Sequence, residues 1–292
     1  MRRTLSTLTM CIFLSAIPWT AKASTPTFTH LYIFGDSYCD VGNVFSATSG
    51  AEPAAPYYNG RFSNGPIWVD HVAGYLGIGP LKASLAGGTD FAFGGAEVTA
   101  PVTTAQGTIP SVPQQVALYL QSTGNKADPK ALYIIEGGGN DILNAASNSP
   151  QQLGFQIALG ISESELLLRR AGARHFLIPN LFNVGVLPAA ARNAAFAAAA
   201  TTATNNSLDV LLALEDALEG VHILRLDVFS LESAVVTDPN HFGFTDVTDP
   251  CLSTTICADP DRTFFWDAEH PTVFGHAFFA VTTENTLATQ AW

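Results

Sequence analysis

Charged side chains are scarce in this chain. Only 13% of its 292 residues are Asp, Glu, Lys or Arg, whereas 47% are hydrophobic and 10% are aromatic. A chain of this composition can bury a large core, which argues against intrinsic disorder and against a coiled coil. Basic residues are the scarcer charged class: 13 Lys and Arg stand against 25 Asp and Glu, a net charge of −12. Because such a charge repels phosphate backbones, we expect no nucleic acid partner.

Cysteine is also rare, with four residues in the whole chain. No Cys-x-x-Cys pair and no cluster of Cys and His indicates a metal site, so we expect no metal ion and no cofactor. Cys251 and Cys257 lie close together in a loop rich in Pro, Asp and Thr and could form a disulfide in an oxidising compartment, although the sequence does not decide whether they are bonded. Cys39 is then left over, and we favour a small packed residue over a reactive thiol.

One apolar run opens the chain, at residues 8–19. It follows Arg2 and Arg3 and ends before the small-x-small pattern of residues 21–23, which is typical of a cleaved secretory signal. The run is short for a membrane span, and an uncleaved N-terminal anchor is the alternative. We therefore expect a signal peptide at residues 1–23, a secreted or periplasmic protein and no integral membrane span after cleavage. Residues 24–292 would keep 10 basic and 25 acidic residues, a net charge of −15.

Short apolar runs alternate with helical patterns along the rest of the chain. Four runs predict buried strands, at residues 31–34, 132–135, 175–178 and 221–226. Helical spacing predicts helices at residues 68–76, 151–171, 189–218 and from 271 onward, the last with Phe274, Ala277, Phe278 and Val281 on one face. Strands separated by helices imply parallel pairing through right-handed crossovers, with helices on both faces. Nothing in the middle of the chain resembles a linker. We therefore expect one α/β domain over residues 24–292, a three-layer α/β/α sandwich around a central, mainly parallel sheet.

Sites in such sheets form beyond the carboxyl ends of the strands. Ser37 follows the first predicted strand in a Gly-Asp-Ser turn, and Asn140 follows the second. Asp267 and His270 are three residues apart, so the carboxylate can reach imidazole Nδ1 and leave Nε2 as a base for a serine hydroxyl.

A second pair has the same spacing. Asp238 and His241 also form an Asp-x-x-His segment, so spacing alone does not choose between the two histidines. His270 lies where a loop meets a predicted helix, which can hold a base in place, whereas His241 lies in a long loop. We therefore favour His270.

Four segments, in order, resemble the sequence blocks of the GDSL, or SGNH, hydrolases. They lie at residues 34–43, 91–96, 138–141 and 267–270 and read FGDSYCDVGN, FAFGGA, GGND and DAEH. The resemblance implies the SGNH hydrolase fold, with Ser37 as nucleophile, His270 as base and Asp267 as the acid that orients it. The oxyanion donors would be the Ser37 amide, the Gly95 amide and the Asn140 side chain, with Gly94 as the alternative to Gly95. Tyr38 stands where the family has leucine, from which we expect altered packing and no loss of chemistry.

Residues 57–68 resemble the bacterial subgroup that includes secreted phospholipases, lysophospholipases and acyltransferases. The resemblance implies a secreted serine hydrolase that cleaves lipid or short-chain acyl esters, without a cofactor, by an acyl-enzyme mechanism. The alternatives are a carbohydrate acetyl esterase with the same site and an inactive surface-binding protein on this fold. Tyr57, Tyr58 and Phe62 could pack on the core or form a wall of the acyl pocket.

Overall fold

A four-stranded parallel sheet lies at the centre of the computed structural model, which describes residues 27–145, 149–216 and 220–290. The strands run in the order β1-β4-β5-β6, and all three pairings are parallel. Their bounds are β1 Leu31–Phe34, β4 Leu132–Ile135, β5 His175–Pro179 and β6 His222–Leu226. All four residues of β4 are buried, as expected of an inner strand covered on both faces, which is why it reads as a continuous apolar run. The prediction of four parallel strands is confirmed.

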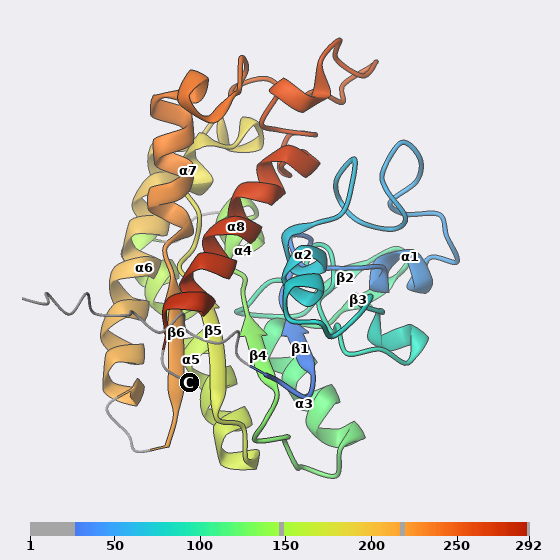
Figure 1. Ribbon diagram of the computed structural model, residues 1–292. Helices are drawn as coiled ribbons and strands as arrows, with labels where there is room; N and C mark the ends of the chain where they lie inside the picture. The colour runs from blue at the N-terminus through green and yellow to red at the C-terminus, as the bar shows by residue number, and fades with distance from the viewer. Residues whose placement is uncertain (1–26, 146–148, 217–219, 291–292) are drawn as a thin grey trace, which may run out of the picture.

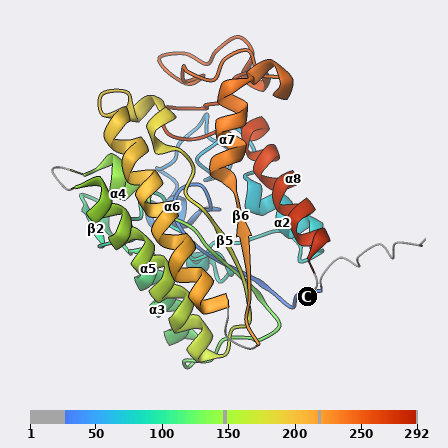
Figure 2. The same cartoon turned by 90° about the vertical axis from the view of Figure 1, so that its left-hand side faces the viewer.

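Helices cover both faces of this sheet (Figures 1 and 2). One layer holds α3 (Val112–Ser122), α5 (Pro150–Ala171) and α6 (Ala194–Asp216), and the opposite layer holds α2 (Trp68–Tyr75), α7 (Val228–Thr237) and α8 (Val273–Thr289). Two short helices, α1 (Asn43–Ala47) and α4 (Gly139–Leu143), and five single turns of 3₁₀ helix complete the described part. The turns are Ser84–Ala86, Val184–Val186, Pro188–Ala190, Pro239–Phe242 and Pro260–Arg262. The three-layer α/β/α architecture is thus confirmed.

Buried apolar side chains from both faces of the sheet form one hydrophobic cluster. The single domain over residues 24–292 stays a prediction. The expected signal peptide at residues 1–23 lies outside the described residues. Among those that are described, no helix is long and apolar enough to cross a membrane.

The last helix turns a different face to the core than predicted. Its buried residues are Gly275, His276, Phe279, Ala280, Thr283 and Leu287. Phe274 and Val281 are 39% and 54% exposed, so the face predicted from them is not the core face. Phe274 and Phe278 instead pack against the Phe244 ring, at centroid distances of 5.4 and 5.6 Å. Aromatic contacts with a loop therefore account for the two phenylalanines of the apolar stripe.

A small antiparallel hairpin was not predicted. It consists of β2 (Val102–Thr104) and β3 (Gly107–Ile109), each three residues long, in the register Val102↔Ile109. Among the cysteines, Cys251 and Cys257 form a disulfide, and Cys39 is a buried free thiol, as we favoured.

Candidate active site

The turn after β1 holds Ser37 at the carboxyl end of the sheet. Gly35 approaches β4 so closely that a Cβ there would lie 2.9 Å from the Glu136 carboxylate oxygen Oε2. The Gln115 side chain clamps this glycine: the Gly35 amide donates to Gln115 Oε1 at 2.8 Å, and Gln115 Nε2 donates to the Gly35 carbonyl at 2.9 Å. No local pattern pointed to Gln115, which lies on α3, far from Ser37 along the chain.

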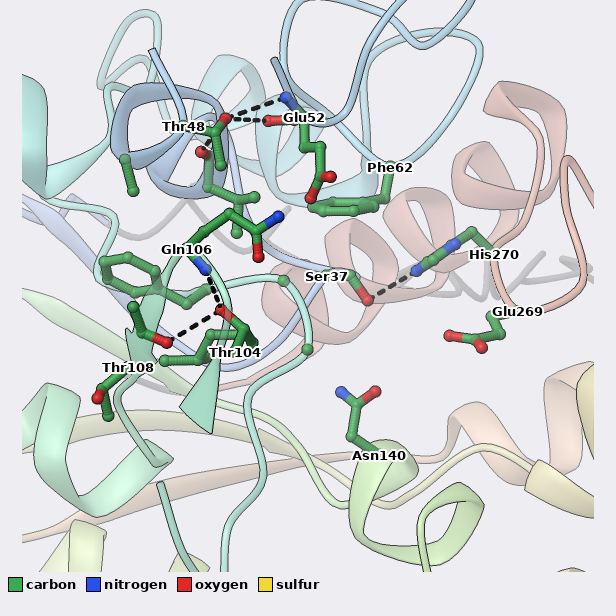
Figure 3. A pocket seen from close by; sticks show the side chains of 17 residues that line it. Ser37, Thr48, Glu52, Phe62, Thr104, Gln106, Thr108, Asn140, Glu269 and His270 are labelled. Atoms are coloured by element: carbon green, nitrogen blue, oxygen red, sulfur yellow. Dashed lines mark hydrogen bonds between the residues drawn. The ribbon is translucent and has the colours of Figure 1, made fainter. Parts of the chain in front are cut away.

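Ser37, His270 and Asp267 form one hydrogen-bonded chain. The Ser37 hydroxyl lies 2.7 Å from His270 Nε2, and Figure 3 shows this contact at the wall of a cavity. On the other side of the ring, His270 Nδ1 lies 2.8 Å from both carboxylate oxygens of Asp267. A carboxylate can only accept, so Nδ1–H donates to Asp267 and Nε2 is left to accept from the serine.

Several donors surround the Asp267 carboxylate. Oδ1 accepts from the backbone amides of Glu269 and His270 at 2.8 Å, and Oδ2 accepts from the Tyr57 hydroxyl at 2.6 Å. Burial alone would raise the pKa of Asp267, but the neighbouring His270 and these hydrogen bonds lower it to about 2. Burial alone would lower the pKa of His270, but the Asp267 charge and hydrogen bond raise it above its ordinary value. Asp267 is therefore ionised throughout the range in which the imidazole titrates.

The competing histidine lies elsewhere. His241 is exposed on the 3₁₀ turn Pro239–Phe242, where its ring contacts Phe242 at 5.1 Å. Its amide bonds to the Asp238 carbonyl, as in an ordinary turn. Of the two Asp-x-x-His segments, the structure brings only the one containing His270 to Ser37.

The two candidate glycines differ in what their amides do. The Gly94 amide donates to Asp40 Oδ2 at 2.9 Å, so it is already used. The amides of Gly95 and Ser37 have no acceptor within the described residues. Gly95 also has a φ of +78°, a conformation that glycine adopts at no steric cost. Of the two, Gly95 is therefore the one with an amide free to bind an anion.

Asn140 lies on α4, directly after β4, and lines the same cavity as Ser37 (Figure 3). Its Nδ2 donates to the Ala96 carbonyl at 3.0 Å, whereas its contact with Asp36 Oδ2 is 3.4 Å long. A contact of that length is weaker than an ordinary hydrogen bond. A stronger acceptor placed in the cavity can therefore compete for this N–H.

Tyr38, the departure from the family pattern, is buried beside the site. Its ring stacks on Phe182 at 4.3 Å, and its hydroxyl donates to the Glu269 carbonyl at 2.8 Å. Tyr38 thus contacts the segment that carries His270.

A cavity of about 280 Å³ opens beside Ser37 and His270. Its apolar lining comes from α1, from the loops around it and from β3, and consists of Val44, Ala47, Phe62, Phe93 and Ile109. The unpredicted hairpin forms one wall, and the Phe62 ring, 5.2 Å from the His270 ring, forms another. Tyr58 is 39% exposed. Of the three aromatic residues in this loop, only Phe62 lines the cavity, because Tyr57 reaches Asp267 instead.

Within the described residues, no group of three or more His, Cys, Asp and Glu side chains could hold a metal ion. The arrangement around Ser37 supplies a nucleophile, a base, an ionised acid and unpaired N–H donors, the groups that acyl transfer through a serine requires.

Comparisons with known proteins concern the family and the fold. The family model described as GDSL-like Lipase/Acylhydrolase matches residues 31–281. A phosphatidylcholine-sterol acyltransferase from Aeromonas hydrophila is 30% identical over 242 residues, 82% of this chain and 70% of that one. A thermolabile hemolysin from Vibrio parahaemolyticus is 25% identical over 84% of this chain but 60% of its own length, so the chain spans only part of these relatives. A solved structure of a lipolytic G-D-S-L family protein from Veillonella parvula superimposes with a TM-score of 0.51 at 12% identity, over 89% of this chain and 99% of that one, and shows the shared fold.

Proposed function

The chain belongs to the GDSL-like lipase/acylhydrolase family, and we propose that it is a serine hydrolase that cleaves carboxylic esters at Ser37. The observation that carries this proposal is the continuous chain from the Ser37 hydroxyl through His270 to Asp267, with a Ser37–His270 distance of 2.7 Å. In this geometry the base can take the serine proton without any rearrangement.

The proposed reaction has two steps. Ser37 Oγ attacks the ester carbonyl while its proton passes to His270 Nε2, and Asp267 stabilises the imidazolium that forms. The amides of Ser37 and Gly95 and the Asn140 side chain donate to the oxyanion. His270 then returns the proton to the departing alcohol, which leaves an acyl-serine. Water, deprotonated by the same histidine, cleaves the acyl-serine to the free acid and restores the hydroxyl.

The cavity supports a substrate with an acyl chain longer than acetyl. Five apolar side chains line it among polar ones, and its volume of about 280 Å³ approaches that of small-molecule sites in general. An acetyl group would fill only a small part of this space, and the rest is available to a longer acyl chain or to the alcohol part of the ester. The name of the Aeromonas relative points the same way, towards lipid acyl groups, and towards release of the acyl group to an alcohol as well as to water.

We also propose export, with residues 1–23 as the signal. The support from the described chain is the Cys251–Cys257 disulfide, since such bonds persist in oxidising compartments.

The test is hydrolysis of a p-nitrophenyl ester series of increasing acyl length by the wild type and three variants. Ser37→Ala and His270→Ala should abolish turnover, whereas His241→Ala should leave it unchanged. A fluorophosphonate probe should label the folded wild type at Ser37, which an inactive binding protein would not allow. Retained hydrolysis in Ser37→Ala would refute the assignment, and a rate that peaks at acetyl would favour the acetyl esterase.

A second readout of the base is the pH dependence of kcat/KM. An imidazolium cannot accept the serine proton, so kcat/KM should fall as the pH drops below the pKa of His270. Since Asp267 raises that pKa, the midpoint should lie above the ordinary imidazole value of 6.5. A profile that stays flat between about pH 5 and 8 would contradict a histidine base.

A further inference from the structure

The loop at residues 57–65 is bound along its length to the segment that carries Asp267 and His270. The Tyr57 hydroxyl donates to Asp267 Oδ2 at 2.6 Å, and the Ser63 hydroxyl donates to the Pro271 carbonyl at 2.9 Å. Further on, the Val273 amide donates to Asn64 Oδ1 at 2.7 Å. Three side chains of one loop thus fix the acid, the residue after the base and the start of α8.

Packing holds the Tyr57 ring in the position that this hydrogen bond requires. The ring meets Trp266 edge-on, at a centroid distance of 6.2 Å and an angle of 89°, and lies 6.3 Å from Phe62. Phe62 in turn covers the His270 ring. Tyr57 is only half-buried, but its hydroxyl is directed at the carboxylate by two aromatic neighbours.

The Tyr57 hydroxyl differs from the other donors to Asp267 because it comes from a distant part of the chain. Oδ1 is satisfied by two amides from the Asp267 segment itself, those of Glu269 and His270. Oδ2 is shared between His270 Nδ1 and the Tyr57 hydroxyl. Within the described residues, Tyr57 therefore provides the one hydrogen bond to this carboxylate from outside residues 267–270.

We propose that Tyr57 is a positioning residue, whose hydroxyl orients Asp267 and determines how strongly the carboxylate holds the imidazole of His270. The inference rests on the proposed function, since it assigns Tyr57 a role through the proposed acid and base. Tyr57 does not line the cavity, so it acts on the reaction and leaves substrate binding alone.

The direction of the effect follows from charge. A hydrogen bond from Tyr57 withdraws negative charge from Oδ2, so less of that charge faces Nδ1. Removing the hydroxyl leaves a more fully charged carboxylate beside the imidazole, which stabilises the imidazolium and raises the pKa of His270. The acid limb of kcat/KM should then move to higher pH, while the loosened carboxylate lowers kcat at every pH.

The experiment compares Tyr57→Phe with a matched control, Tyr58→Phe. The neighbouring Tyr58 is 39% exposed, and its hydroxyl makes no hydrogen bond within the described residues. Tyr57→Phe should lower kcat about ten-fold, the size expected of one charge-assisted hydrogen bond, and should leave KM unchanged. The acid limb of kcat/KM should move up by roughly half a pH unit, because a hydrogen bond to the carboxylate changes the pKa of the neighbouring imidazole only in part. Tyr58→Phe should match the wild type in kcat, in KM and in the position of the acid limb.

Two further arms separate positioning from a structural role. Site-specific replacement of Tyr57 by 3,5-difluorotyrosine keeps the ring but makes the hydroxyl a stronger donor, so the acid limb should move in the opposite direction, to lower pH. In an Asp267→Asn background, Tyr57→Phe should cause no further loss, because the charge it acts on is gone.

The outcomes distinguish this inference from the proposed function. If hydrolysis depends on Ser37 and His270 but Tyr57→Phe behaves like Tyr58→Phe, the positioning role is refuted and the hydrolase stands. Equal ten-fold losses with and without the Asp267 carboxylate would likewise overturn it, since Tyr57 would then act elsewhere. Hydrolysis that survives Ser37→Ala would overturn the proposed function first.

Discussion

The buried imidazole of His276 should make the protein sensitive to acid. His276 lies on the core face of α8, is 1% exposed, and neither ring nitrogen has a hydrogen-bond partner in the described part of the chain. Its ring is enclosed by Tyr38 and Phe279, at 5.9 and 6.1 Å. Burial above all, and the nearby His270 and His71, lower the pKa of His276 from 6.5 to about 3. In the folded protein it is therefore neutral at any moderate pH.

The size of the effect follows from proton linkage. The unfolded chain binds a proton at His276 below pH 6.5, whereas the folded chain does so only near pH 3. The contribution of His276 to the free energy of unfolding is therefore at its full value above pH 6.5. It declines as the pH falls towards 3, because the unfolded state takes up the proton first. Between about pH 7.5 and about pH 5 the loss amounts to about 2 kcal/mol, from 1.36 kcal/mol per unit of pKa difference expressed in that interval.

A second buried group works in the opposite direction. Burial raises the pKa of Glu232 to about 8, partly offset by a hydrogen bond from the Asn183 amide. The folded chain keeps this proton where the unfolded chain releases it, so stability from Glu232 decreases as the pH rises above 4.5. The total stability of the wild type therefore cannot isolate His276, and a variant is needed.

The decisive comparison is urea unfolding of the wild type and His276→Leu at about pH 7.5 and about pH 5. The control is His241→Leu, a substitution of an exposed histidine. The difference in unfolding free energy between wild type and His276→Leu should shift by about 2 kcal/mol in favour of the variant on acidification. The difference for His241→Leu should stay constant. If the His276→Leu difference is the same at both pH values, the imidazole is not held neutral in the core and the reasoning fails.

Three further predictions concern the site and its surroundings. Asn140→Ala should lower kcat by about 10²- to 10³-fold with little change in KM, as measured on a p-nitrophenyl ester, and an unchanged kcat would remove Asn140 from the oxyanion donors. Gly94→Ala should destabilise the fold by about 1–3 kcal/mol in thermal unfolding, because its Cβ would lie 2.3 Å from the Phe62 ring; an unaltered melting temperature would show that the ring moves aside freely. Replacing Cys251 and Cys257 together by serine should cost about 2 kcal/mol in urea unfolding with kcat preserved at low temperature, since the bond closes a short loop that does not line the cavity; a loss of kcat in the folded variant would contradict this.

The sheet and the nucleophile were predictable because their signals are local. A parallel strand buried on both faces is a continuous apolar run, and a glycine turn after such a strand places Ser37 at the carboxyl edge. Spacing does not choose between His270 and His241, since both carry an Asp three residues earlier. What separates them is contact with Ser37 across more than two hundred residues, which no local pattern encodes.

Other features depended on packing between distant segments. Gly94 and Gly95 are adjacent and identical in sequence, and the structure distinguishes them by the bond from the Gly94 amide to Asp40 and by the positive φ of Gly95. The hairpin at residues 102–109 has strands of three residues, too short for an alternating pattern to be recognised. Tyr57 was expected to pack on the core or line the pocket, and its bond to Asp267 spans 210 positions.

Buried carboxylates accept hydrogen bonds from amides of the Gly95 loop that have no backbone acceptor. The amides of Phe91 and Phe93 bond to the carbonyls of Ile33 and Gly35, but beyond them the loop follows no strand and its amides need other acceptors. Asp40, three residues after Ser37, accepts from Gly94 and, at its other contacts, from the amides of residues 42–44. Asp141, the neighbour of Asn140, accepts from the amides of residues 98 and 99. One carboxylate therefore ties the Gly95 loop to the nucleophile turn and the other ties it to α4. The three proposed oxyanion donors come from three separate segments, and aspartates from two of them, Asp40 and Asp141, hold the loop of the third.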